Sequence, residues 1–139
     1  MGMKHHGNKS NHEQHRNSDL LRAYRNEAQK AGNIFLPDLL QRVVNSPSVR
    51  FWVSPERAAI VIARIMRGDK LPEMRPLRRE MFFEIYRLAM QLHEQQPDLP
   101  VSHLAEIVVY MPAPKFYMTP GSAKVILHKI KKQQKRKKG

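Results

Sequence analysis

The sequence predicts a mainly α-helical protein containing two copies of one helix-helix-strand-helix unit, related by a pseudo-two-fold axis. Residues 36–68 match residues 101–133 without a gap at a constant offset of 65 positions, and eight of the 33 pairs are identical. Average composition would give about two identities by chance. Each copy has apolar residues at helical spacing and one short run of aromatic and branched residues. A period this long favours two pseudo-symmetric units over a solenoid.

The first copy is predicted to begin with two helices. The first starts near Ser18 or Asp19, either of which can cap it, and ends near Gly32. The second spans about residues 38–45, with its leucines and valines turned inward, and ends before Pro47. These two helices provide the first apolar faces of the expected core.

A strand and a third helix complete the first copy. The predicted strand is residues 50–53, with the sequence RFWV. Ser54 is a candidate N-cap, and Pro55 fits the first helical position because its missing N–H needs no partner there. The third helix is expected to run to about Gly68.

The second copy repeats this order. A long helix begins around Leu77, and a second helix is capped by Ser102 and broken by Pro112. The predicted strand is residues 115–118, KFYM, and Thr119 starts the third helix. Both copies therefore predict the same sequence of elements.

The two predicted strands are expected to pair into a small ribbon about the pseudo-two-fold axis, because isolated strands leave backbone groups without partners. Side chains alternate across a strand, so Arg50 and Trp52 share one face of the first strand, and Phe51 and Val53 form its apolar face. Lys115 and Tyr117 occupy the equivalent face of the second strand. The ribbon would therefore present two cations and two aromatic rings together.

The chain length suits a single domain in which both copies share one core. A polar, His-rich segment precedes this domain and is expected to be a disordered arm, and a Lys-rich tail follows it. The predicted boundaries are residues 1–17 for the arm, 18–68 for copy one, 69–76 for the connector, 77–133 for copy two and 134–139 for the tail, whose basic run starts at Lys129.

The charge of the chain favours a polyanionic partner. The formal net charge is +13, and residues 107–139 contain nine Lys or Arg residues and no acid. There is no cysteine, which excludes disulfides and thiolate chemistry. No apolar run is long enough to span a bilayer, and the polar start has no signal-peptide core. We therefore expect a cytoplasmic protein with no membrane partner.

The predicted ribbon is the first candidate surface for nucleic acid, because cations contact phosphates or guanine edges and rings stack on bases. Alternatively, Trp52 and Tyr117 are core aromatics, with Arg50 and Lys115 solvated at the edge. The remaining candidates lie on the outer part of the third helices, where cations also suit the helix dipole, and in the C-terminal arm. They are Arg64, Arg67, Lys129, Lys131, Lys132, Lys135, Arg136, Lys137 and Lys138.

The sequence lacks the motifs of several function classes. About nine residues separate the second and third helices of copy one, whereas a helix-turn-helix has a turn of about three or four. There is no zinc-finger spacing, glycine-rich phosphate loop or nucleophile elbow. We therefore expect no enzyme and no cofactor. We also expect no metal site, because the histidines of the N-terminal arm have no folded surroundings to orient them; they are His5, His6, His12 and His15.

The segments NSPSVRFWVSPERAAIVI and PAPKFYMTPGSAKVI resemble short, basic, uncharacterised proteins of bacterial phages and mobile elements. The resemblance covers most of the chain after the N-terminal arm. It implies a genomic setting in which small basic proteins act on nucleic acid or in virion assembly. It implies no activity and no binding residues.

Together these features predict a non-enzymatic DNA-binding protein. It would dock through the basic-aromatic surface, while the Lys-rich C-terminal arm adds sequence-independent phosphate contacts. We expect DNA rather than RNA as the partner. The alternatives are an assembly or adaptor protein of a phage or mobile element that binds another protein, and an RNA-binding protein. Because the duplication itself supplies a two-fold axis, a monomer would suffice.

Overall fold

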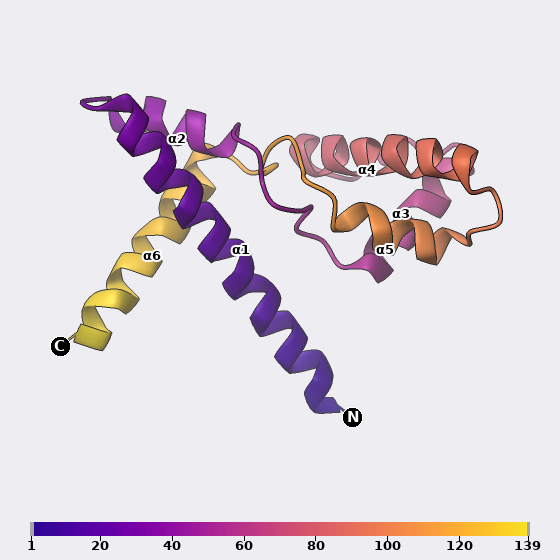
Figure 1. The fold of residues 1–139 in the computed structure, drawn as a ribbon, viewed down its shortest axis with the longest axis horizontal. Coiled ribbons are helices and arrows are strands. Elements are labelled where there is room, and N and C mark those ends of the chain that lie inside the picture. Colours follow the sequence, from indigo (N-terminus) through magenta and orange to yellow (C-terminus); the bar gives the residue numbers. More distant parts are fainter. Residues whose placement is uncertain (1, 139) are drawn as a thin grey trace. The chain divides into compact units, whose positions relative to one another are not determined.

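The computed structural model describes the backbone of residues 2–138 and the side chains of residues 12–136. Within that backbone there are six α-helices and no β-strand (Figure 1). The mainly helical prediction is confirmed, and the prediction of two strands is wrong. The helices are α1 (Gly2–Ala31), α2 (Leu36–Val44), α3 (Pro55–Met66), α4 (Pro76–Gln95), α5 (Val101–Val109) and α6 (Pro120–Lys138). None of the helices in residues 2–138 has the length and apolar character needed to cross a membrane.

The helices form two compact units. Unit 1 comprises Met1–Ser48 and Pro114–Gly139, and unit 2 comprises Val49–Ala113. In unit 1 each of α1, α2 and α6 contacts the other two, and in unit 2 the same holds for α3, α4 and α5. Each unit is therefore a three-helix assembly with its own set of buried side chains.

The boundaries of the two units differ from those of the predicted copies. By sequence α3 belongs to copy one, but it packs on α4 and α5 of copy two, and α6 packs on α1 and α2 of copy one. Pro47 and Pro112 occupy equivalent places just after α2 and α5. Proline disfavours a helical conformation in the residue before it, which agrees with the ends of α2 and α5 ahead of these prolines. The third helices are thus exchanged between the copies.

Two backbone hydrogen bonds hold the exchanged segments. The amide of Phe51 donates to the carbonyl of Val109 at 2.9 Å, and the amide of Phe116 donates to the carbonyl of Val44 at 3.0 Å. These two bonds are related by the same offset of 65 positions that relates the two copies. Each bond joins the segment before one copy's third helix to the last residue of the other copy's second helix.

The segments predicted as strands are irregular. Tyr117 has φ 56°, which lies in the left-handed region, whereas a strand needs negative φ. In the first segment, the Arg50 guanidinium donates to the carbonyls of Phe51 at 3.0 Å and Val53 at 2.9 Å, which are acceptors that a ribbon would use. The predicted ribbon is therefore wrong. The predicted alternation of burial does hold here, because Phe51 and Val53 are buried while Trp52 is partly exposed.

The predicted caps of the third helices are confirmed. The Ser54 hydroxyl accepts a hydrogen bond from the amide of Arg57 at 3.1 Å, and the Thr119 hydroxyl accepts one from the amide of Ser122 at 3.1 Å. The predicted cap at Ser102 is wrong, because α5 already begins at the residue before it and its N-cap makes no side-chain hydrogen bond.

Helix α1 begins much earlier than predicted. It starts at Gly2, so the residues expected to form a polar arm are its first turns, and Asp19 is an interior residue rather than a cap. The Asp19 carboxylate is buried, accepting hydrogen bonds from the Ser48 hydroxyl at 2.8 Å and from Arg22 at 2.8 Å. It thereby ties α1 to the segment after α2. The end of α1 agrees with the prediction: Gly32 follows with φ 62°, a conformation that glycine adopts without strain.

Each unit has its own buried apolar side chains. In unit 1 they include Leu20, Leu39, Leu40, Val43, Val44, Phe116, Ala123 and Leu127. In unit 2 they include Phe51, Val61, Ile62, Leu71, Phe82, Ile85, Leu104 and Val108. The identical pair Phe51 and Phe116 is buried in both units, so the duplicated positions keep their packing role.

Candidate nucleic-acid interface

The four residues of the predicted ribbon belong to different units. Arg50 and Trp52 are in unit 2, whereas Lys115 and Tyr117 are in unit 1. All four side chains are half-buried. The structure therefore divides the predicted surface into two pairs, and neither pair forms part of a strand.

Arg50 is held by contacts within unit 2. Its guanidinium carbon lies 4.3 Å from the ring centroid of Tyr110 and 5.0 Å from that of Trp52, in addition to its two bonds to backbone carbonyls. Such a cation stacked on rings stabilises the loop that it covers. In unit 1 the Lys115 ammonium lies 5.4 Å from the ring centroid of Tyr117. These contacts favour the alternative in which the four residues serve packing.

Arg64 is neutralised by two carboxylates at the end of α3. Its guanidinium pairs with Asp69 at 2.8 Å and with Glu73, and the Asp69 carboxylate also accepts the amide of Leu71 at 2.8 Å. Hydrogen bonding to Glu73 and then to Asp69 raises the pKa of Arg64. The Leu71 amide and then Arg64 lower the pKa of Asp69, and the bond from Arg64 lowers that of Glu73. The arrangement fixes the turn that leads to the buried Leu71.

The cations of α6 are arranged differently. Five of the predicted residues are exposed on this helix, and none of the five forms an ion pair within the part of the chain whose side chains are described. They are Lys129, Lys131, Lys132, Lys135 and Arg136. The side chains of Lys137 and Lys138 lie outside the described residues. Arg67, at the C-cap of α3 in unit 2, is exposed as well.

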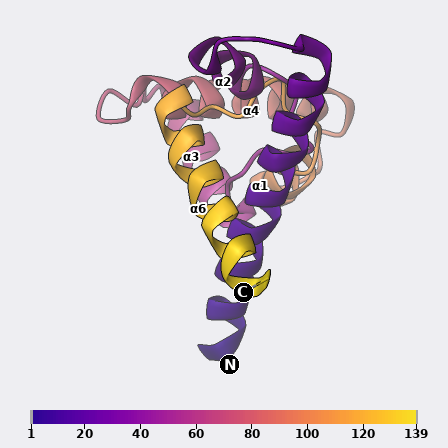
Figure 2. The ribbon, with the colours of Figure 1, turned by 90° about the vertical axis from the view of Figure 1, so that its left-hand side faces the viewer.

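Helix α6 continues through the segment that was predicted as a tail. Its first half packs on α1 and α2 through buried Ala123 and Leu127, and every residue from Lys131 to Arg136 is exposed. In Figures 1 and 2 the C-terminal part of α6, in yellow, runs away from α2. The basic run therefore lies on a helix.

The two units differ greatly in charge. Unit 1 contains 16 Lys and Arg residues against four Asp and Glu residues, whereas unit 2 contains nine against eight. Nearly all of the net charge of +13 therefore belongs to unit 1. No acid is present in α6 to offset it.

A groove beside α6 is lined by residues that were not predicted from the sequence as binding residues. Tyr24 of α1 and the α6 residues Lys124, His128 and Lys131 line it, and the Lys131 ammonium lies 5.6 Å from the ring centroid of Tyr24. The sequence contains one indication of this site: Lys124, His128, Lys131 and Lys135 are three or four positions apart, which is the spacing of one helix face. This spacing indicates a shared face only if the helix continues past His128, whereas the sequence predicts a basic arm there.

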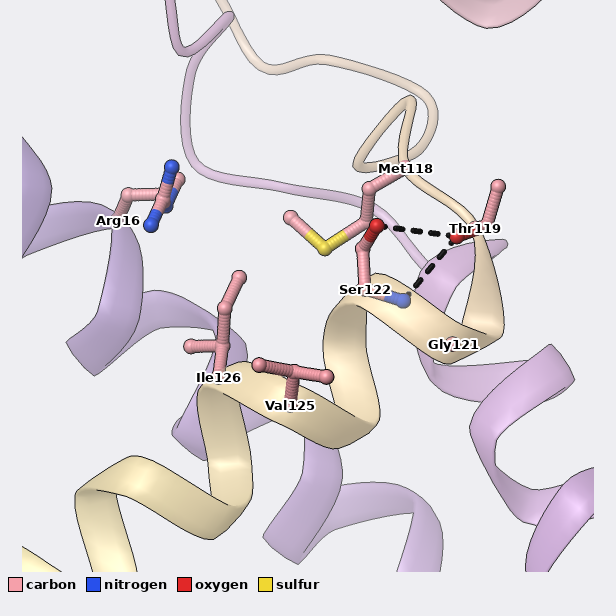
Figure 3. A pocket seen from close by; sticks show the side chains of 7 residues that line it. All are labelled: Arg16, Met118, Thr119, Gly121, Ser122, Val125 and Ile126. Carbon is pink, nitrogen blue, oxygen red and sulfur yellow. Dashed lines mark hydrogen bonds between the residues drawn. The ribbon is translucent and has the colours of Figure 1, made fainter.

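A second, wider pocket of about 590 Å³ lies between α1 and the start of α6 (Figure 3). In this view Arg16 and the Met118 thioether face one another across it. The Arg16 guanidinium donates to the side chain of Asn17 at 3.0 Å, and the Thr119 hydroxyl donates to that of Ser122 at 3.0 Å. The polar groups around this pocket are thus engaged with their neighbours.

Among residues 12–136 there is no group of three or more His, Asp or Glu side chains that could hold a metal ion. Of the histidines in the predicted arm, His5 and His6 lie outside the described side chains. No protein-family model, curated protein or solved structure matches the chain. The candidate interface therefore rests on the geometry and charge of unit 1.

Proposed function

We propose that this chain is a non-enzymatic, cytoplasmic DNA-binding protein that contacts the phosphate backbone through unit 1. One observation carries the proposal: almost the whole excess of positive charge lies in unit 1, and α6 exposes it without any acid. Among the described side chains, the exposed cations of α6 between Lys129 and Arg136 form no ion pair, so they are available to a polyanion. The chain resembles short, basic proteins of phages and mobile elements, and binding to nucleic acid is compatible with that setting.

The dimensions of α6 suit a DNA backbone. From Lys129 to Lys138 the helix is about 14 Å long at about 1.5 Å per residue. Duplex DNA carries about one phosphate per 1.7 Å of its axis, or about eight over this length. Lys129, Lys132 and Arg136 are three or four residues apart and therefore follow one face of the helix. Such contacts position a protein on DNA and provide sequence-independent affinity.

The test is a fluorescence-anisotropy titration of duplex DNA at several salt concentrations. The variant Lys129→Gln/Lys132→Gln/Arg136→Gln removes three cations from α6, and we expect the log–log salt dependence to flatten by about 2.7, at about 0.9 per lost phosphate contact. The control Arg57→Gln/Arg67→Gln/Arg75→Gln removes three exposed cations from unit 2. We expect the control to bind like the wild-type protein.

Three results would contradict the proposal. If wild-type protein shows no salt-dependent binding to DNA, the charge of unit 1 has another purpose. If both triple variants weaken binding equally, the affinity depends only on net charge, and α6 has no special role. A larger loss in the unit 2 variant would restore Arg67 as a contact and move the interface away from α6.

A second candidate function is an adaptor that binds another protein through unit 2. It is favoured by the near balance of charge in that unit and by five of its large apolar side chains being exposed: Val49, Ile60, Met66, Phe83 and Tyr110. Exposed apolar side chains with little net charge suit a protein partner better than a nucleic acid. The same titration separates the two functions, since an adaptor of this kind would not require the cations of α6.

A further inference from the structure

The groove between α1, α2 and α6 combines an aromatic ring, an apolar floor and a basic rim. Its volume is about 120 Å³. Leu40 and Leu127 are buried and form the floor, the Tyr24 ring forms one wall, and Leu36 stands at the entrance with 42% of its surface exposed. Phe35, the neighbour of Leu36 in the chain, is 71% exposed. Apolar and aromatic surface is therefore open to solvent beside the most basic helix of the protein.

The rim is formed by one stripe of α6. Lys124, His128 and Lys131 line the groove, and Lys135 continues the stripe at positions i, i+4, i+7 and i+11. All four side chains are exposed. These residues lie beside the packed face of α6, so a strand bound along them would pass directly over the groove.

The acids nearest in sequence to Tyr24 and Leu36 are Glu27 and Asp38. Glu27, one turn from Tyr24 on α1, pairs with Lys30 at 3.5 Å. Asp38 lies in the first turn of α2, where its charge complements the helix dipole. Neither residue lines the groove.

We propose that this groove binds an unpaired base of single-stranded nucleic acid, while the α6 stripe contacts the adjoining phosphates. This inference rests on the proposed function and narrows its substrate class. Base stacking on aromatic rings, together with a basic track for the backbone, is how proteins bind single strands with little sequence preference. The bases of a duplex are already stacked and paired, so a duplex can use the stripe but not the groove.

The size of the groove limits what enters it. Pockets for whole small-molecule ligands measure about 300–1,000 Å³, so a volume of about 120 Å³ admits one planar ring and leaves the sugar and phosphate outside. The Lys131 ammonium now lies over the Tyr24 ring. A base that stacks there moves this cation toward the backbone phosphate, where it gains a stronger partner.

The experiment compares strands that carry equal numbers of phosphates. Oligothymidine, oligouridine, an abasic deoxyribose-phosphate strand and a duplex are titrated with the full chain. We expect either or both base-bearing single strands to bind about fivefold or more tightly than the abasic strand, as one stacked base provides. The difference between thymidine and uridine strands then reports whether DNA or RNA is the preferred source of the base.

Two variants locate the effect. Tyr24→Leu is expected to abolish the preference over the abasic strand, while Tyr86→Leu, which changes a half-buried tyrosine of α4 in unit 2, preserves it. Leu36→Glu is expected to abolish it too, by placing a carboxylate at the entrance. Because Leu36 is the first residue of α2, an acid there suits the helix dipole and the fold is retained. Gln41→Glu, also exposed on α2, adds the same charge and is expected to leave the preference unchanged.

The outcomes separate this inference from the proposed function. If all strands bind with a steep salt dependence but base-bearing and abasic strands bind equally, the groove has no role and only this inference fails. If the preference exists but survives both Tyr24→Leu and Leu36→Glu, the base is bound elsewhere and the inference also fails. If no strand binds in a salt-dependent manner, the proposed function fails with it.

Discussion

Unit 1 and unit 2 are built alike but differ in what their surfaces can bind. Each consists of three helices in mutual contact, and each takes two helices from one copy of the repeat and one from the other. The buried phenylalanines Phe51 and Phe116 and their backbone hydrogen bonds are equivalent. The net charge is not, since cations outnumber acids by 16 to four in unit 1 and by nine to eight in unit 2. Packing was kept while surface charge diverged.

Arg64 and Lys129 are aligned residues that illustrate this divergence. Arg64 pairs with two carboxylates that follow it in the chain. Lys129 is exposed, and no acid follows it. The same position thus stabilises a turn in unit 2 and offers a cation to solvent in unit 1. Arg64 lies near the end of α3 and is met by the acids of the following turn, whereas α6 continues past Lys129 without an acid.

The largest expected effect is on the shared packing. Phe51→Ala and Phe116→Ala should each lower the free energy of unfolding by about 3–5 kcal/mol, because each removes a nearly fully buried ring and leaves a cavity. Urea denaturation measures the loss. Hydrogen exchange then locates it, with protection lost in residues 49–113 for Phe51→Ala and in the helices of unit 1 for Phe116→Ala. If either substitution lowers hydrogen-exchange protection equally in both units, the two units do not unfold independently.

The second comparison separates stability from binding. We expect Arg64→Gln to lower the thermal midpoint of unfolding and to leave DNA affinity unchanged, because the turn loses its ion pairs. We expect Lys129→Gln to leave the midpoint unchanged and to reduce the salt dependence of DNA binding by about 0.9. Calorimetry and anisotropy titration check the two effects. A loss of affinity in Arg64→Gln would assign both units to the interface.

The pH dependence tests the same ion pairs. The pKa values of Asp69 and Glu73 are lowered in the folded protein from their ordinary values of 3.8 and 4.5. The stability that Arg64 provides is therefore present above pH 4.5, and it is lost as pH falls through the lowered values. The difference in stability between wild-type protein and Arg64→Gln should shrink in acid. A difference that is constant between neutral pH and pH 3 would contradict the ion-pair explanation.

The smallest expected effect concerns the two aromatic residues of the irregular segments. Tyr117 has φ 56°, and asparagine tolerates this conformation better than tyrosine. Relief of this strain offsets the lost ring contact with Lys115, so Tyr117→Asn should change the free energy of unfolding by less than about 1 kcal/mol. Trp52→Asn gains no such relief and removes a ring beneath Arg50. Denaturation should show it to be the more destabilising of the two.

Several local features could be predicted because they depend on neighbouring residues. A hydroxyl before a proline predicts a helix start, and Ser54 and Thr119 act as caps. The alternation of apolar residues predicted the burial of Phe51 and Val53, even though the segment is not a strand. Ser102 was also predicted as a cap, but no proline follows it, and it lies inside α5 because that helix begins one residue earlier.

The candidate site was harder to predict. Composition predicts the cations of α6 as binding residues but does not predict that they lie on a helix, because ten nearly consecutive polar residues give no apolar periodicity to indicate one. The groove at Tyr24 required contacts between residues about 100 positions apart in the chain. The prediction of Arg50 as a nucleic-acid contact depends on its being a cation beside aromatic residues. The same proximity gives it the ring and carbonyl contacts that hold it in place.

The sequence alone determined that the protein is duplicated and helical, where its third helices start, and that its charge gathers at one end. These properties follow from residue type and from spacing within a few turns of helix. Tertiary structure decided which helices pack together and which cations are neutralised. Both depend on the path of the chain after α2 and α5, where prolines and backbone hydrogen bonds to distant carbonyls direct each third helix to the other copy. A local sequence pattern does not predict this exchange, because a third helix would bury the same apolar face whether it packed on its own copy or on the other copy.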